Sequence, residues 1–139
     1  MRARGDHLCL HEPFGEAWYQ GEDRRCPPQR SGGPTPGLTF ASVWDDLRAR
    51  AAEDDPVFIK EFPHQCEHLW DDAFLDHFTH SFLIRDPART LPSIYDKWPD
   101  FALAETGFAE QRTLFDRLAH QNGAPPPVID AEDLVSDPA

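Results

Sequence analysis

Residues 79–87, with the sequence THSFLIRDP, are the stretch that most strongly indicates the fold. The apolar run at residues 82–84 is typical of a buried strand, and it stops at Arg85. Asp86 and Pro87 then indicate the start of a helix, because aspartate caps a helix N-terminus and proline fits the first helical position. An arginine at the carboxyl end of a strand, beside a helix N-terminus, is a common way for open α/β sheets to bind phosphate. The stretch therefore predicts an anion-binding turn between a strand and a helix.

The amino-acid composition indicates one acidic domain. The chain has 139 residues, and its 13 Lys and Arg against 25 Asp and Glu give a formal net charge of −12. Such a surface repels nucleic-acid backbones and anionic membranes, so we expect neither as a partner. The length fits a single domain but is small for a complete α/β enzyme that handles nucleotides. The sequence therefore predicts one incomplete domain over residues 1–139.

Two further patterns concern the cellular compartment. No stretch is long and apolar enough to span a membrane, and residues 1–30 lack the apolar core of a secretory signal. Cys9, Cys26 and Cys66 are odd in number and widely spaced, which favours reduced thiols over a disulfide framework. The sequence therefore predicts a cytoplasmic protein.

Short apolar runs alternate with helical patterns along the chain. Strands are predicted at residues 8–13, 56–62, 81–85 and 127–130. Helices are predicted at residues 42–51 with Ser42 as the cap, 69–78, 87–98 with a kink or interruption at Pro92, and 105–121. Residues 15–40 are rich in proline, glycine and polar side chains, which predicts a mobile loop.

The order of these elements predicts an α/β fold with a parallel sheet of about four strands and flanking helices. Parallel neighbours need long crossover connections, and helices or long segments separate the predicted strands. Because ligands of such sheets bind at the carboxyl edge, we expect the site there. The polar residues that end the strands are Glu12, Lys60 with Glu61, Arg85 and Asp130. The phosphate-loop patterns GxxxxGK[ST] and GxGxxG do not occur in the sequence.

Residues 82–87 (FLIRDP), with Ser93 eight positions after Arg85, resemble the 3′-phosphate-binding motif of the sulfotransferase family. The donor of that family is 3′-phosphoadenosine 5′-phosphosulfate, and the resemblance implies that Arg85 and Ser93 hold its 3′-phosphate. Further stretches that resemble strands of the family are residues 10–14 (LHEPF), 57–60 (VFIK) and 127–134 (PVIDAEDL). The resemblance thus implies part of a P-loop NTPase-like, three-layer sandwich.

The resemblance also implies a reaction and its site residues. Family members transfer a sulfuryl group from the donor to a hydroxyl or amine of a small-molecule acceptor. Lys60 corresponds to the strand lysine near the sulfuryl group, where a cation stabilises the transferring charge. Many members have a histidine base two positions after this lysine; Phe62 stands there in this chain, and His64 is the nearest substitute. The reaction needs no metal.

The chain departs from the family pattern at both ends. It lacks the N-terminal loop of the Pro-Arg/Lys-Ser-Gly type that holds the 5′-phosphosulfate, and it stops before a later segment that holds the adenosine phosphate. We therefore expect an interior piece of such a domain, with weak or no activity, because the backbone donors of that loop are missing. The alternative is a noncatalytic remnant or interaction module of the same fold, in which a homo- or hetero-oligomer covers the exposed sheet.

Each candidate residue also has a simpler interpretation. Arg85 can pair with a carboxylate at the sheet edge, from Asp86, Asp130 or Glu12. Ser93 can be a solvated helix serine, Lys60 a lysine at a strand end on the surface, and His64 a loop histidine.

Residues 64–68 contain side chains that could bind a metal. His64, Cys66 and His68 have ligand types that zinc accepts. Structural zinc sites usually use two separated ligand pairs, and the sequence holds no second pair of the CxxC kind. We therefore predict no metal site.

Overall fold

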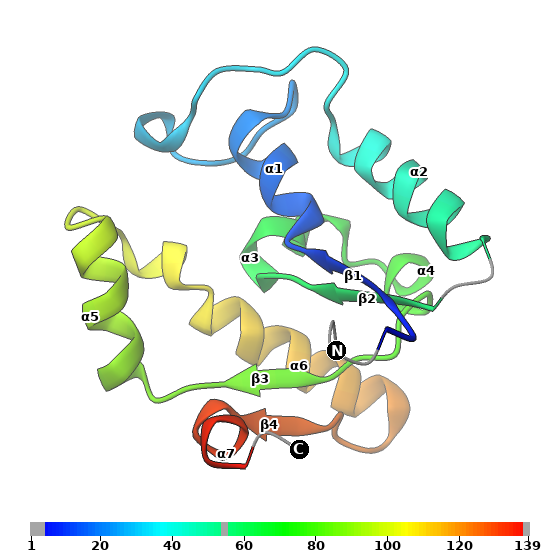
Figure 1. The fold of residues 1–139 in the computed structure, drawn as a ribbon, viewed down its shortest axis with the longest axis vertical. Coiled ribbons are helices and arrows are strands. Elements are labelled where there is room, and N and C mark those ends of the chain that lie inside the picture. Colours follow the sequence, from blue (N-terminus) through cyan, green and yellow to red (C-terminus); the bar gives the residue numbers. More distant parts are fainter. Residues whose placement is uncertain (1–4, 54–55, 138–139) are drawn as a thin grey trace. The chain divides into compact units, whose positions relative to one another are not determined.

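The computed structural model describes residues 5–53 and 56–137, which belong to two compact units (Figure 1). Unit 1 comprises residues 1–66 and unit 2 comprises residues 67–139. Each unit contains a two-stranded parallel sheet and several helices, so the expected α/β class with parallel strands is confirmed. The four expected strands are present, and they form two pairs instead of one sheet. That residues 1–139 form a single domain stays a prediction.

Unit 1 is built on a parallel pair of strands. Its elements are β1 (Leu8–His11), α1 (Pro13–Gln20), η1 (Pro28–Arg30), α2 (Phe40–Ala51), β2 (Val57–Lys60) and α3 (Pro63–Cys66). β1 and β2 run in the same direction, and their last paired residues are His11 and Lys60. The charged residues that follow the two strands therefore lie at the same end of this sheet.

The core of unit 1 consists mainly of apolar side chains from its two longer helices. Phe14 and Ala17 of α1, with Phe40 and Leu47 of α2, are buried. The rings of Phe14 and Phe40 are stacked with their centroids 6.5 Å apart. α1 begins almost directly after β1, with Glu12 alone between the two elements (Figure 1).

Two helix starts in unit 1 differ from expectation. α2 is capped by Thr39, whose hydroxyl accepts the N–H of Ser42 at 3.0 Å, while the Ser42 hydroxyl accepts the N–H of Thr39 at 2.9 Å. The prediction that Ser42 is the cap is therefore wrong, because Ser42 completes a capping box from the third helical position. The helix α1 was missed, although Pro13 at its first turn is a typical start signal. The mobility of the rest of residues 15–40 stays a prediction.

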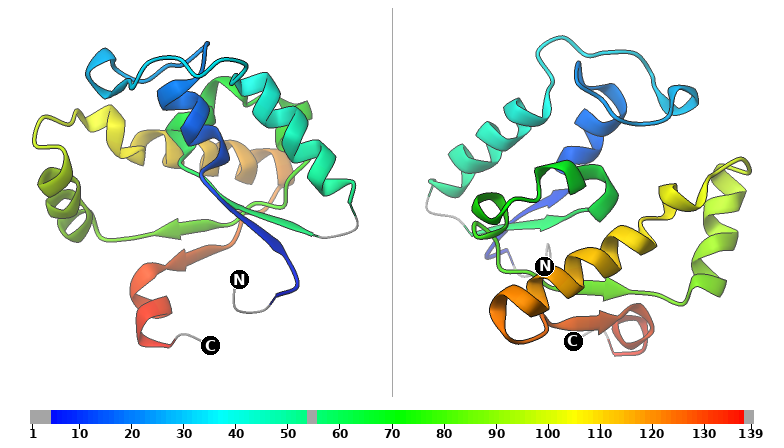
Figure 2. Two further views of the ribbon diagram at one scale, coloured as in Figure 1. Left: turned by 45° about the horizontal axis from the view of Figure 1, so that its top comes forward. Right: turned by 180° about the vertical axis from the view of Figure 1, so that it is seen from behind.

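Unit 2 contains the stretch that opened the sequence analysis. Its elements are η2 (Glu67–Leu69), α4 (Asp72–Leu75), β3 (Phe82–Ile84), α5 (Pro87–Lys97), η3 (Leu103–Thr106), α6 (Phe108–Asn122), β4 (Val128–Asp130) and α7 (Ala131–Ser136). β3 and β4 pair in parallel, with Phe82 opposite Val128. Figure 2 shows α6 running beside β3 in both views. The connection between the two strands is therefore the helical crossover that parallel pairing requires.

The core of unit 2 joins this sheet to α6. Phe82 of β3 is buried with Leu114 and Leu118 of α6 and with Leu75 of α4. The rings of Phe82 and Phe115 meet edge to face, with centroids 5.5 Å apart. The remaining apolar side chains of the strands are exposed, namely Leu83, Ile84, Val128 and Ile129.

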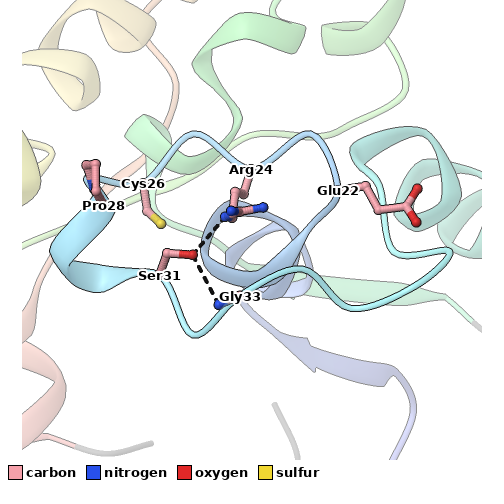
Figure 3. Close-up of a pocket in the computed structure, with 6 residues that line it drawn as sticks. All are labelled: Glu22, Arg24, Cys26, Pro28, Ser31 and Gly33. Carbon is pink, nitrogen blue, oxygen red and sulfur yellow. Dashed lines mark hydrogen bonds between the residues drawn. The ribbon is translucent and has the colours of Figure 1, made fainter.

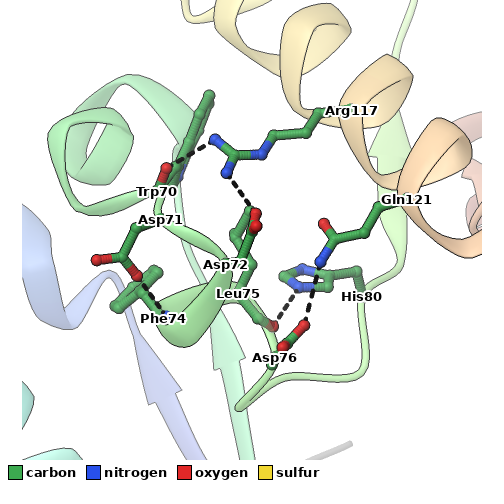
Figure 4. A network of polar contacts seen from close by, with 9 residues as sticks. All are labelled: Trp70, Asp71, Asp72, Phe74, Leu75, Asp76, His80, Arg117 and Gln121. Atoms are coloured by element: carbon green, nitrogen blue, oxygen red, sulfur yellow. Dashed lines mark hydrogen bonds and ion pairs between the residues drawn. The ribbon is translucent and has the colours of Figure 1, made fainter.

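Polar contacts tie α6 to the segment before β3 (Figure 4). The guanidinium of Arg117 donates to the carbonyl of Trp70 and to the carboxylate of Asp72, each at 2.7 Å. The amide of Gln121 donates to the carboxylate of Asp76 at 3.2 Å. These bonds hold the α4 region against the same helix that covers the sheet.

The helices of unit 2 begin and end at points that the periodicity did not show. The helix predicted at residues 69–78 is too long, because the structure has only η2 and the short α4 in this region. Asp71 caps a new helix there by accepting the N–H of Phe74 at 2.7 Å. α5 continues through Pro92, so the predicted interruption is wrong, and α5 has no buried residue. Among the described residues, no helix has the length and apolar character needed to cross a lipid bilayer.

We expect Leu118→Ala to lower the free energy of unfolding by about 2 to 5 kcal/mol, because it leaves a cavity between α6 and the sheet of unit 2. The measurement is urea unfolding of the full chain followed by circular dichroism. Val135→Ala is the matched control, because Val135 is 81% exposed and should change stability by less than about 0.5 kcal/mol. Equal effects of the two substitutions would contradict the described core.

Candidate functional site

Arg85 lies between β3 and α5, directly after the strand and before the helix cap. Its side chain is exposed and makes no hydrogen bond or ion pair with any residue that the structure describes. The neighbouring carboxylates serve helix starts instead. Asp86 accepts the N–H of Ala88 at 2.8 Å, and Asp130 accepts the N–H of Glu132 at 2.9 Å. The simpler interpretation of Arg85 as the partner of Asp86 or Asp130 is therefore not supported by the geometry.

Ser93 lies on α5, exposed, about two turns from the start of the helix. No hydrogen bond joins it to Arg85 among the described residues, so the two side chains offer separate donors along one strand-to-helix segment. Arg89, one turn after the cap of α5, pairs with Glu132 of α7 at 2.5 Å. Sequence reasoning missed this contact, because its partners are 43 positions apart.

Lys60 lies at the end of β2, and its ammonium forms an ion pair with the carboxylate of Glu12. The same ammonium lies over the ring of Phe62, 3.5 Å from the ring centroid. The side chain of Lys60 is 38% exposed and that of Glu12 is 23% exposed. The structure thus gives this lysine a specific carboxylate partner at the carboxyl end of the sheet of unit 1.

Glu61 is a second half-buried carboxylate at the same strand end, and sequence reasoning gave it no role beyond ending the strand. Its Oε2 accepts the N–H of Phe14 in the first turn of α1 at 2.8 Å, and its Oε1 accepts the N–H of Phe62 at 2.9 Å. Burial raises the pKa of Glu61 from 4.5 to about 7, and the charge of Glu12 also raises this pKa, while the two hydrogen bonds and Lys60 lower it. Its contact with Phe14 of α1 joins residues 47 positions apart, which no local sequence pattern shows.

His64, the candidate base, lies in α3 and is buried. Its ring meets the ring of Trp18 edge to face at 5.6 Å and lies 5.7 Å from the ring of Phe62. Phe62 itself is 40% exposed. The structure therefore brings His64, Phe62 and Lys60 to one turn after β2, with His64 enclosed by aromatic rings.

The structure also bears on metal ligands and cysteines. Within the described residues, no group of three or more His, Cys, Asp or Glu side chains is placed to hold a metal ion. His64 and Cys66 are buried while His68 is exposed, and the Cys66 thiol donates to the carbonyl of Pro63 at 3.7 Å. Cys9, Cys26 and Cys66 form no disulfide within the described residues.

An open hollow in unit 1 lies against the loop after α1 (Figure 3). The residues that line it are Glu22, Arg24, Cys26, Pro28, Ser31 and Gly33. Its arginine is already engaged, because Arg24 donates to the Ser31 hydroxyl at 2.7 Å and to the carbonyl of Gly21 at 3.3 Å. None of the predicted site residues lines this hollow.

Comparison with known proteins gives one family. A family model described as a sulfotransferase domain matches residues 45–139, which include β2 and all of unit 2. The four predicted site residues, Lys60, His64, Arg85 and Ser93, lie inside the matched range. Neither the curated proteins nor the solved structures include a match to this chain.

The raised pKa of Glu61 makes stability depend on pH. Because the native state holds this proton between pH 4.5 and about 7 while the unfolded chain releases it, the free energy of unfolding falls as pH rises through that window. We expect Glu61→Gln to stabilise the chain by about 2 to 3 kcal/mol more at pH 8 than at pH 5, since the amide is never charged.

Urea unfolding of the two proteins at both pH values measures this difference. Glu16→Gln is the control, because Glu16 is an exposed carboxylate of α1, the helix whose Phe14 N–H Glu61 accepts. A Glu61→Gln effect that is the same at both pH values would contradict the burial of this carboxylate.

Proposed function

The chain belongs to the sulfotransferase domain family, and from this membership we propose that it binds 3′-phosphoadenosine 5′-phosphosulfate and takes part in sulfuryl transfer to a small-molecule hydroxyl or amine. The observation that carries the proposal is the exposed guanidinium of Arg85, which has no partner among the described residues, at the carboxyl end of a parallel strand. In a chain with a formal net charge of −12, an anionic donor needs such a local cation.

Arg85 has the chemistry to hold the 3′-phosphate. A guanidinium presents a planar set of N–H donors that fits two phosphate oxygens at once. The start of α5 adds a favourable dipole, although Asp86 already accepts one of its free N–H groups. We assign to Ser93 a single hydroxyl donor further along the same helix. Together these groups form the 3′-phosphate half of the donor site.

Lys60 and His64 are the proposed catalytic residues. In the reaction the acceptor oxygen or nitrogen forms a bond to sulfur while the bond from sulfur to the 5′-phosphate oxygen breaks, and the electron pair leaves with adenosine 3′,5′-bisphosphate. Lys60 supplies positive charge at the transferring group, as positioning and charge stabilisation dominate such transfers. His64 accepts the proton that the acceptor loses.

We also propose a cytoplasmic location and reduced thiols. The odd number and wide spacing of the three cysteines favour this compartment.

We expect Arg85→Ala to weaken binding of adenosine 3′,5′-bisphosphate by at least about tenfold, because a charged double hydrogen bond is lost. Isothermal titration calorimetry of the full chain measures this. Arg112→Ala is the matched control: Arg112 is an exposed arginine of α6 that pairs with Asp116, and its loss should leave the affinity unchanged. If the wild type does not bind the nucleotide, the donor site is refuted and the noncatalytic alternative is favoured.

We expect Lys60→Met to reduce sulfuryl transfer and to leave the affinity for adenosine 3′,5′-bisphosphate unchanged, because this product lacks the sulfuryl group. A transfer assay with labelled donor and a panel of phenols and amines supplies the rate. Loss of nucleotide affinity in Lys60→Met, with turnover intact, would contradict the assigned role.

A further inference from the structure

Glu12 has an unfavourable backbone conformation. Its φ of 52° and ψ of 55° lie in the left-handed region, and it is the one residue other than glycine with a positive φ within residues 5–53 and 56–137. A side chain with a Cβ is disfavoured in this region. The following Pro13 adds to the cost, since a residue before proline prefers an extended conformation. Such conformations persist only where the surrounding structure holds them, and they often mark functional sites.

The main chain of Glu12 joins a strand to a helix without a loop. Its N–H donates to the carbonyl of Lys60 at 2.7 Å, which extends the ladder between β1 and β2 by one bond. Its carbonyl accepts the N–H of Gly15 at 3.0 Å in the first turn of α1. This tight corner ties the backbone of Glu12 to Lys60 and places its carboxylate at the end of β2.

The carboxylate of Glu12 is not used to cap α1. Glu12 is the cap residue of this helix, yet its side chain makes no capping hydrogen bond. The N–H of Phe14 is instead bound by Glu61, which lies 47 positions away in the sequence. The carboxylate of Glu12 contacts the ammonium of Lys60. His11 also reaches this carboxylate, with its Nε2 3.5 Å from Oε1.

The space around this corner is closely filled. A Cβ atom at Gly15 would lie 3.0 Å from Oε1 of the Gln65 side chain and 3.3 Å from the Cβ of Glu12. Gln65 is 1% exposed, so its side chain has little freedom to move away. The backbone of α1 therefore approaches Gln65 and the Cβ of Glu12 closely at Gly15, a position that has no room for a larger side chain.

We propose that Glu12 is a positioning residue for Lys60: its strained corner holds the lysine ammonium at the end of β2, over the ring of Phe62, ready for the transferring sulfuryl group. The effect of Glu12 on catalysis rests on the proposed function. The contact between Glu12 and Lys60 does not depend on that function. Glu12 lies outside the residues that the family model matches.

The sequence makes the contact easy to test, because Lys60 and Lys97 are its two lysines. Trace labelling of the full chain with acetic anhydride, read by mass spectrometry, gives the reactivity of Lys60 relative to that of Lys97. Glu12→Asn is the informative variant, because asparagine accepts the left-handed conformation better than glutamate does and lacks the charge. Glu12→Gln keeps the side-chain length, and Glu16→Gln on the exposed face of α1 is the control.

We expect Glu12→Asn to unfold at the same or a higher urea concentration than the wild type, while the relative labelling of Lys60 rises severalfold. We expect its kcat for sulfuryl transfer to fall by roughly tenfold to a hundredfold with no change in affinity for adenosine 3′,5′-bisphosphate. Glu12→Asp should recover part of the turnover, since it restores a carboxylate.

The outcomes separate this inference from the proposed function. Unchanged Lys60 labelling in both Glu12→Asn and Glu12→Gln would overturn the positioning role, whatever the turnover. Absence of transfer in the wild type would refute the proposed function, and the labelling would still decide whether Glu12 holds Lys60. If kcat falls only as far as the loss of folded protein in the urea measurement explains, Glu12 is a structural residue and the inference is wrong.

Discussion

A pair of parallel strands buries too little apolar surface to be stable in water, and the described residues of each unit form one such pair. Each sheet therefore depends on the helices of its own unit. In unit 2, Phe82 is buried against Leu114 and Leu118 of α6. In unit 1, the corner at Glu12 makes α1 continuous with β1, and Phe14 of α1 packs against Phe40 of α2. Because the helices stabilise each sheet, they also hold the ends of its strands, where the charged residues lie.

The two strand ends use charge in different ways. At the end of β3, the carboxylates of Asp86 and Asp130 cap helices, and the exposed guanidinium of Arg85 has no partner within residues 5–53 and 56–137. At the end of β2, Lys60 is held by Glu12, and the nearby carboxyl of Glu61 has its pKa raised to about 7 by burial. An arginine that is open to solvent suits the capture of a phosphate. A lysine that is held in one place suits the stabilisation of negative charge that develops in a transition state.

Much of the fold followed from local patterns, and the failures have identifiable causes. All four strands were predicted close to their observed positions, because short apolar runs ended by charge or proline are strong signals. The helix at 69–78 was predicted too long, since the spacing of its apolar residues suited a helix while the cap at Asp71 started a new one. α1 was missed because the longer stretch that starts at Gly15 is rich in turn-forming residues, which are typical of a loop. Packing against α2 compensates for the weak helix propensity of Gly15.

The sequence by itself determined the strand-to-helix turn at residues 82–87 and the α/β class, because these rest on neighbours along the chain. The roles of Arg85, Ser93, Lys60 and His64 came from the resemblance to the sulfotransferase family, and they stay proposals. Only the tertiary structure decided that Glu12 holds Lys60 and that Glu61 caps α1. These partners are 48 and 47 positions apart, and parallel pairing of β1 with β2 brings them together. Burial of a carboxylate is likewise a property of the packed helices around it. No local pattern carries that information, because the cost of removing a charge from water depends on everything that surrounds it.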